Sequence, residues 1–345
     1  MRMLAAKAAM LGVQPGDALT LVVALLGAED PSISAQAHAT LDALPPHVLE
    51  GALRAKLPAP VIDVLAERYG QDETVLPRLL GMADISTETL ERLALRATER
   101  IGEIIATNEV LLLAHPSVIE KLYMNRAVRM STADRLIDLA VRNGIELAFP
   151  AFKEAALAIQ NELIPEPTEE PTYDDLLFRQ TESVSQETEA QDEDVCDADE
   201  EGKEQVKEKF LPLFAQIQNM TISQKIRRAM LGNGAERMLL VRDTNRLVAE
   251  AAAKSPRMTE PEAVRISASR AVSDDVLRVI ATNREFVRSY QIKLNLVANP
   301  RTPFTFATRL IPHLRENDLK NLSRSKNVPA NVVTTVRQQL LRKKH

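Results

Sequence analysis

Apolar residues recur along most of the chain with the period of an α-helix. Two sets of four follow the spacing i, i+3, i+4 and i+7: Ala133, Leu136, Ile137 and Ala140, and Ala307, Leu310, Ile311 and Leu314. Because this spacing places one apolar stripe on a helix, we expect amphipathic helices of about 8–14 residues joined by brief polar turns. The pattern predicts an all-α fold.

The sequence also marks where several helices begin. Capping boxes, in which a hydroxyl and a carboxylate satisfy backbone amides reciprocally, are expected at Ser117–Glu120 and Thr259–Glu262. Thr302 is expected to cap a helix whose first residue is Pro303. The helices that begin there are expected to be short and to follow one another through brief polar turns.

The N-terminal region superficially resembles a signal peptide, because basic residues precede an apolar run over residues 18–28. A Gln-Pro-Gly-Asp turn interrupts that pattern, and we favour Asp17 as the N-cap of a buried helix over residues 19–26. No apolar stretch reaches the ~18 residues needed to span a bilayer. With a single cysteine, which excludes a disulfide framework, we expect a cytoplasmic protein without membrane insertion.

Composition agrees with helices, since the chain has only 11 glycines, 3% aromatic residues and no tryptophan. The net charge of −5 averages three unlike regions: residues 1–164 carry −6, residues 165–204 carry −14 and residues 205–345 carry +15. The acidic region has too few bulky apolar residues to offset its ordering entropy. We therefore predict an N-terminal helical-repeat module (1–164), a disordered acidic linker (165–204) and a basic C-terminal helical-repeat module (205–345).

An internal duplication is indicated by sequence matches at an offset of 174 or 175 residues. Residues 125–143 and 299–317 share six identities, where chance gives roughly one or two. Upstream, the tetrapeptide Ile-Ala-Thr-Asn recurs at an offset of 175. We infer that residues 60–143 and 230–317 are copies of one helical module.

Short helices in tandem bury their apolar faces by stacking, which predicts an α-solenoid in each module. A finer repeat within the second copy agrees with stacking. Val-Ala-Asn-Pro-Arg-Thr-Pro at 297–303 returns in degenerate form at 325–329 and at 254–259.

This motif resembles the leucine-rich repeat variant, an all-helical relative of HEAT and armadillo repeats in bacterial proteins. The resemblance covers about residues 254–335 and, more faintly, residues 60–143. It implies a binding scaffold, and a structural role for Asn299 and Asn327 in hydrogen-bonding the exposed backbone of the turns. The chain lacks the cysteine cluster that binds an iron–sulfur cluster in one family member, so that function is not implied.

The sequence contains no spacing pattern that is typical of a catalytic or metal-binding site. No two of the five histidines are three or four residues apart. Cys196 lies among carboxylates, which raise a thiol pKa. The Gly-Asn-Gly at 232–234 lacks the rest of a phosphate loop and favours a helix–helix turn. We expect no catalytic residue, no cofactor and no metal, and an enzyme with a hidden cleft is the least favoured alternative.

The basic charge of the C-terminal module is the strongest remaining signal. Candidate anion- or partner-binding residues are Arg227, Arg228, Arg237, Arg242, Arg246, Lys293, Arg301, Lys320, Arg324, Lys326 and Arg337. On one face of a solenoid they form a stripe that attracts phosphate backbones. The alternative is a solvated face that keeps the protein soluble.

A small apolar cluster in the acidic linker is a candidate docking motif, formed by Tyr173, Leu176, Leu177 and Phe178. We expect it to fold on a partner or on the solenoid itself, with a chance apolar island as the alternative. A linker of charge −14 beside a module of charge +15 is also suited to fold back and compete with anionic ligands.

The favoured function is a scaffold or adaptor that binds a protein partner, whose identity the sequence does not name, through helical-repeat surfaces. The alternative is binding of nucleic acid or another polyanion through residues 205–345, modulated by the acidic linker.

Overall fold

The computed structural model describes residues 1–160, 162–164, 166–188, 195–198 and 204–344. These residues form an all-α fold in which the helices run from five to fifteen residues. They fall into two compact units, Met1–Leu147 and Ala148–His345, which are described separately. The all-α prediction is confirmed.

The first unit consists of eleven short helices. In chain order they are α1 (Arg2–Ala6), α2 (Pro15–Ala24), α3 (Pro31–Asp42), α4 (Pro46–Ala52), α5 (Ala59–Tyr69), α6 (Leu76–Leu80), α7 (Thr87–Arg96), α8 (Glu99–Ala106), α9 (Glu109–Ala114), α10 (Pro116–Tyr123) and α11 (Met130–Arg142).

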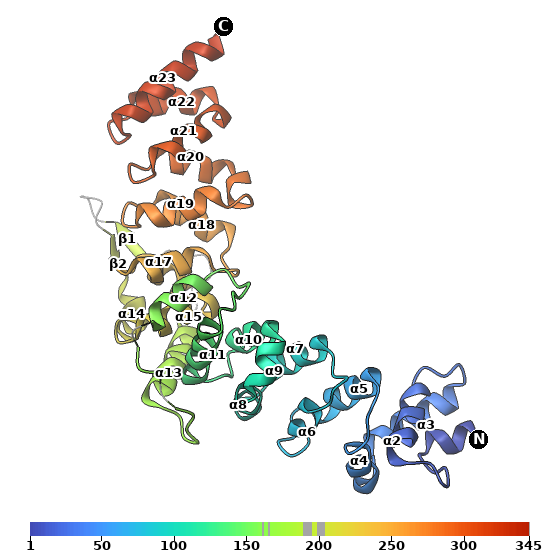
Figure 1. The fold of residues 1–345 in the computed structure, drawn as a ribbon. Helices are drawn as coiled ribbons and strands as arrows, with labels where there is room; N and C mark the ends of the chain where they lie inside the picture. The colour runs from blue at the N-terminus through green and yellow to red at the C-terminus, as the bar shows by residue number, and fades with distance from the viewer. Residues whose placement is uncertain (161, 165, 189–194, 199–203, 345) are drawn as a thin grey trace. The chain divides into compact units, whose positions relative to one another are not determined.

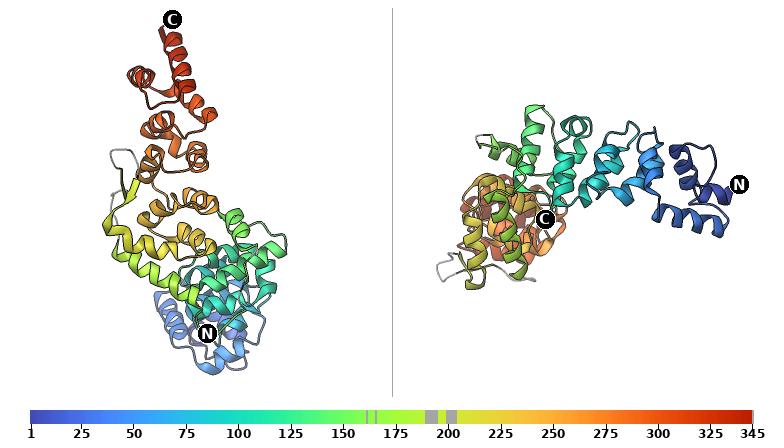
Figure 2. Two further views of the ribbon diagram at one scale, coloured as in Figure 1. Left: turned by 90° about the vertical axis from the view of Figure 1, so that its left-hand side faces the viewer. Right: turned by 90° about the horizontal axis from the view of Figure 1, so that it is seen from below.

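The second unit begins with α12 (Phe152–Ile159), α13 (Tyr173–Glu187) and a two-stranded antiparallel ribbon, β1 (Cys196–Ala198) and β2 (Glu204–Val206). From α15 (Ile222–Leu231) to α23 (Ala330–Lys344) its helices succeed one another in chain order along the unit (Figure 1; left view of Figure 2). The remaining elements are η1 (Glu208–Phe210), α14 (Leu211–Gln218), α15 (Ile222–Leu231), α16 (Gly234–Leu240), α17 (Arg246–Ala253), α18 (Glu260–Ala268), α19 (Asp274–Thr282), η2 (Phe286–Arg288), α20 (Tyr290–Ala298), α21 (Phe304–Leu310), η3 (Ile311–His313), α22 (Glu316–Arg324) and α23 (Ala330–Lys344).

The apolar stripes predicted from the sequence form parts of the two cores. All eight of their residues are buried, and the most accessible, Leu310, is 6% exposed. Burial of one face of each helix removes apolar surface from water and stabilises the stack by roughly 25 cal/mol per Å².

The two predicted copies match helix by helix. The same pair of helices is in contact in both copies: α7 packs against α10 in the first, and α18 packs against α20 in the second. The corresponding pairs are α7 with α18, α8 with α19, α9 with η2, α10 with α20, and α11 with α21 plus η3. This correspondence supports the duplication.

The same asparagine joins neighbouring helices in both copies. Asn125 Nδ2 donates to the carbonyls of Ala94 and Ala97, both at 2.8 Å. Asn299 Nδ2 donates to Ser267 O at 2.9 Å and Ser269 O at 2.7 Å. We refer to this arrangement as the asparagine clamp.

The structural role expected for Asn299 holds, but its setting is buried and not exposed, because Asn299 is only 5% accessible. Asn327 differs from the expectation: its side chain is exposed. Ser325, two residues earlier, takes the place that Asn299 has in its turn, since its Oγ accepts from the backbone N–H two residues on at 3.2 Å.

Several helix starts also differ from the predicted ones. The box at Thr259 is confirmed, with Glu262 accepting from the Thr259 backbone N–H at 2.8 Å. Asp17 and Ser117 lie inside the first turns of α2 and α10, because Pro15 and Pro116 already begin those helices. The helix expected to begin at 303 starts at Phe304 instead.

The acidic segment is the largest departure from the sequence prediction. Residues 173–187, expected to be disordered, form α13, which packs against α14. Cys196, expected among solvated carboxylates, is buried in β1. Residues 189–194 and 199–203 of the same segment lie outside the described residues, so the expected disorder is untested there.

Candidate functional site

Two of the predicted surface arginines are core residues of the second unit. Arg227 and Arg228 on α15 are 0% and 2% exposed, and their guanidinium carbons lie 5.1 and 5.0 Å from the centroid of the Phe178 ring. Arg228 Nε also donates to Glu236 at 2.7 Å, and Glu182 lies 3.8 Å away. Cation–π stacking and ion pairing therefore hold these charges inside the protein.

Two more candidates are neutralised by buried or half-buried carboxylates. Arg237 pairs with Glu262 at 2.7 Å, and Arg242 Nε donates to Glu204 at 2.6 Å. Burial works against ionisation of Glu204, but Arg242 and the hydrogen bond from Ser269 outweigh it and lower the pKa of this carboxyl. The prediction of an exposed basic stripe is wrong for Arg227, Arg228, Arg237 and Arg242, because internal acids and one aromatic ring hold their side chains.

The docking motif of the acidic segment divides into two halves. Leu177 and Phe178 are 7% and 2% exposed and pack inside the second unit, whereas Tyr173 and Leu176 are 75% and 54% exposed. The helix that carries the motif is also held by a hydrogen bond, since Asn233 Nδ2 donates to the carbonyl of Ser185, on α13, at 2.8 Å. Within the described residues, half of the motif is thus docked on the chain's own helices.

The other seven predicted residues lie on or beside helices α17 to α23. Arg246 is exposed but pairs with Glu250 and Asp275. The remaining six carry their charge at the end of the second unit: half-buried Lys293, and exposed Arg301, Lys320, Arg324, Lys326 and Arg337.

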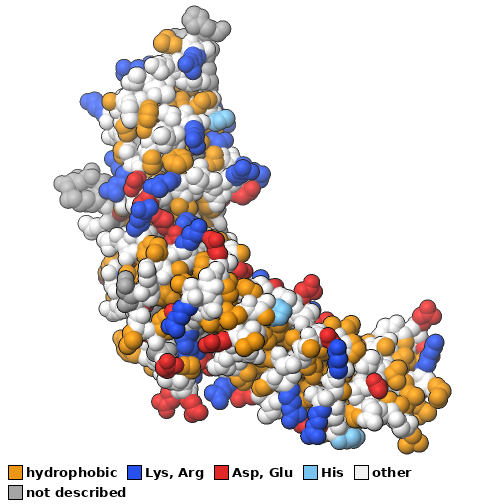
Figure 3. Space-filling model, viewed as in Figure 1, with side chains coloured by type: hydrophobic (Ala, Val, Ile, Leu, Met, Phe, Trp, Pro, Cys, Tyr) orange, Lys and Arg blue, Asp and Glu red, His pale blue; other side chains and the backbone are white. Residues whose placement is uncertain are grey.

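We refer to residues 276–342 as the C-terminal basic region. It holds twelve Lys and Arg against three Asp and Glu. All three acids have local partners: Glu285 pairs with Arg288, Glu316 pairs with Lys320, and Asp318 accepts from the Tyr290 hydroxyl. On the face drawn in Figure 3, blue side chains are prominent and red ones sparse over this region.

A pocket of about 290 Å³ lies where the turn after α20 meets the start of α23. Thr302 at its wall is 6% exposed, and its hydroxyl has no hydrogen-bond partner among the described residues. Phe304 beside it is 42% exposed. The lining residues, which include Arg301 from the predicted set, are Asp274, Pro300, Arg301, Thr302, Pro303, Phe304, Pro329, Asn331 and Val332. We call this site the Thr302 pocket.

The sequence predicts a capping role for Thr302. It gives no site role to Asp274, Phe304 or Asn331. A signal for Thr302 was present, since it is polar at a position where the related turns at 254–259 and 325–329 carry Met258 and Val328.

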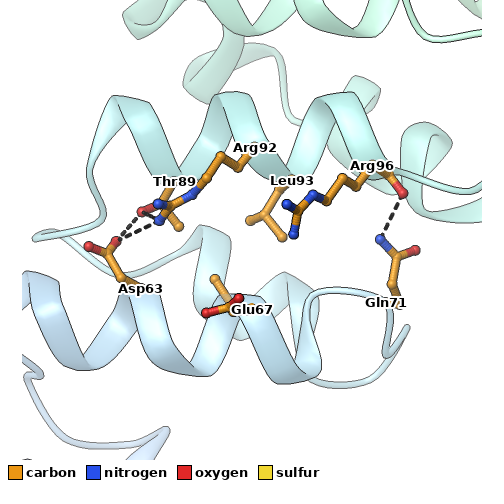
Figure 4. A pocket seen from close by; sticks show the side chains of 8 residues that line it. Asp63, Glu67, Gln71, Thr89, Arg92, Leu93 and Arg96 are labelled. Carbon is orange, nitrogen blue, oxygen red and sulfur yellow. Dashed lines mark hydrogen bonds and ion pairs between the residues drawn. The ribbon is translucent and has the colours of Figure 1, made fainter. Parts of the chain in front are cut away.

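The first unit has its own pocket, of about 230 Å³, between α5 and α7 (Figure 4). Its polar walls pair largely with each other: Asp63 accepts from Thr89 and lies 3.7 Å from Arg92, and Gln71 Nε2 donates to the carbonyl of Arg96 at 2.9 Å. These contacts join neighbouring helices, whereas the Glu67 carboxylate and the Arg96 guanidinium, which also line the pocket, take no part in them.

In the described ranges, no group of three or more His, Cys, Asp or Glu side chains is arranged to hold a metal ion. None of the helices in that part of the chain is long and apolar enough to cross a membrane.

No protein-family model and no curated protein sequence matches the chain.

Proposed function

We propose that the protein is a non-enzymatic scaffold whose two helical units are α-solenoids of the HEAT-like, leucine-rich-repeat-variant type that bind a protein partner. The observation that carries this is the recurrence of one helical module with the same asparagine clamp at Asn125 and Asn299. Such clamps fix successive helices in one orientation, so that their outer faces form an extended binding surface.

Affinity capture combined with cross-linking tests the scaffold function. The tagged full chain is recovered from nuclease-treated extract of its native host after chemical cross-linking, with an unrelated acidic helical protein as control bait. We expect one protein in near-stoichiometric amount, cross-linked to lysines of this chain. Recovery of no protein above the control, or loss of the partner on nuclease treatment, would contradict the scaffold function.

A second candidate function is polyanion binding, favoured by the charge of the C-terminal basic region. Binding of phosphate backbones by exposed Lys and Arg weakens steeply with salt. Since Arg227, Arg228, Arg237 and Arg242 are internal, this function rests on exposed residues such as Arg324, Lys326 and Arg337. Any modulation by the acidic segment would then act on these residues.

The second candidate is tested by titrating labelled single-stranded DNA and RNA with the full chain at two salt concentrations. The triple variant Lys320→Gln, Arg324→Gln, Lys326→Gln is expected to weaken binding at low salt. A matched variant of the first unit, Arg54→Gln, Arg78→Gln, Arg100→Gln, removes the same charge from other exposed side chains. Equal losses in both variants, or no binding at low salt, would exclude a site in the C-terminal basic region.

A further inference from the structure

Five turns of the chain share a four-residue pattern after a helix end. In each, the first side chain, Asn or Ser, accepts a hydrogen bond from the backbone N–H two residues later. The fourth residue is buried in every case. The five turns are 125–128, 255–258, 269–272, 299–302 and 325–328.

The fourth position of these turns is apolar in four cases and polar in one. Val128, Met258, Val272 and Val328 fill it elsewhere, and Thr302 fills it after α20. Threonine has nearly the shape of valine, so packing alone gives no reason for the hydroxyl. A buried hydroxyl without a partner lowers stability, and Thr302 is one of the residues that line an open pocket. The Thr302 hydroxyl is therefore placed to hydrogen-bond a ligand.

The other walls of the Thr302 pocket show which chemistry fits it. Exposed Arg301 offers guanidinium donors, Asp274 offers a carboxylate acceptor, and Phe304 with Pro300 offers an apolar face. An extended peptide supplies a carbonyl, an N–H and a side chain for these three features. A nucleic-acid backbone supplies no N–H for the Asp274 carboxylate.

Charge around the pocket selects among peptides. The C-terminal basic region has twelve basic against three acidic residues, which favours a ligand with acidic flanks. The chain already binds such a segment internally, since acidic α13 inserts Phe178 against Arg227 and Arg228 and places Glu182 near Arg228.

We propose that the Thr302 pocket binds an acidic peptide segment of a partner protein through a hydrophobic anchor on Phe304. Arg301 and Thr302 donate to the peptide backbone or a carboxylate, and Asp274 accepts from a peptide N–H. This inference rests on the proposed scaffold function and names the chemistry of its partner.

The test uses the full chain and a fluorescein-labelled pool of nine-residue peptides with a central Leu, Phe or Tyr between Asp and Glu. Fluorescence anisotropy gives the apparent Kd, and thermal unfolding gives the Tm. Thr302→Val is expected to weaken binding by about 5- to 10-fold, the loss of one hydrogen bond, while the Tm stays equal or rises. Thr302→Ser is expected to keep the affinity.

A matched control moves the hydroxyl to an equivalent turn. Val128→Thr is expected to lower the Tm and leave the peptide Kd unchanged, because that residue belongs to the first unit and does not line the pocket. The inference is overturned if Thr302→Val binds the pool as the unmodified chain does, if Lys-flanked peptides bind equally well, or if only single-stranded DNA binds. A captured partner that cross-links elsewhere would leave the scaffold function standing while the peptide test fails.

Discussion

At the scale of single residues, the buried polar side chains stabilise the fold by satisfying backbone groups that the helices leave open. Asn299 serves three backbone groups at once, two carbonyls through Nδ2 and the N–H of Arg301 through Oδ1. The sequence motif identified this asparagine, because its turn is local. It did not identify the carbonyls, which lie about 30 residues earlier and meet Asn299 only after the helices stack.

Replacing the clamp residue should be far more costly than replacing its sequence relative. We expect Asn299→Ala to lower the free energy of unfolding by about 2–4 kcal/mol, since two buried carbonyls lose their donor. Asn327→Ala, at an exposed position, should change it by less than about 0.5 kcal/mol. Urea unfolding followed by circular dichroism compares the two. Similar effects would show that the clamp is energetically unimportant.

The Glu204–Arg242 pair makes stability depend on acid pH. The pKa of Glu204 is lowered from its ordinary value of 4.5 in the fold, so its contribution is fully present above pH 4.5 and is lost as the pH falls through the lowered pKa. The Tm deficit of Glu204→Gln should therefore be largest near pH 7 and shrink below pH 4.5. A Tm deficit that does not change with pH would show that Glu204 stabilises the fold through packing and not through its charge.

At the scale of elements, α13 shows why composition misjudged the acidic segment. Its buried stripe contains Leu177, Thr181 and Ser185, spaced four residues apart. The Thr181 hydroxyl is satisfied within its own helix by the Leu177 carbonyl at 2.9 Å. Small polar residues with satisfied hydroxyls can be buried, yet they add nothing to an apolar pattern. The capping box of Thr172 and Asp175 was the readable signal for a helix.

Phe178 should be the anchor of this helix. We expect Phe178→Ala to lower stability by about 3–5 kcal/mol, because it leaves a cavity and removes the ring that two buried guanidinium groups contact. Tyr173→Ala, on the same helix but 75% exposed, is the control and should have little effect. Hydrogen exchange of α13 amides should rise strongly in the first variant only; protection that survives Phe178→Ala would mean that other contacts hold the helix.

At the scale of the whole molecule, a formal charge of −5 conceals charges that cancel inside the structure. The helical spacing of apolar residues was sufficient to predict helices and their buried faces. Sequence matches at an offset of 174 residues predicted which helices of the two copies correspond. Charge counting failed to predict the surface, because it treats Arg228 and Arg324 alike, although one lies beside Glu236 and the other is exposed. Which basic residue meets which acid depends on contacts between helices.

A local perturbation in the second unit should stay local. In the proposed solenoid each helix contacts mainly its neighbours, so stability is a sum of nearest-neighbour contributions. In Asn299→Ala we expect faster hydrogen exchange in α18, α20 and α21, and unchanged exchange in α13 and α14. A uniform increase throughout the unit would indicate one cooperative block.

The docking of α13 has a consequence for dissecting the protein. The partners of Arg227, Arg228 and Arg242 include Phe178, Glu182 and Glu204, all upstream of residue 205. A fragment that starts at residue 205 would lose these partners, although Arg228 would keep Glu236 and Arg242 would keep the Met238 carbonyl. The affinity of this fragment for DNA or heparin would then include a contribution from guanidinium groups that lose partners through the cut. Fragments of the second unit should start before α12.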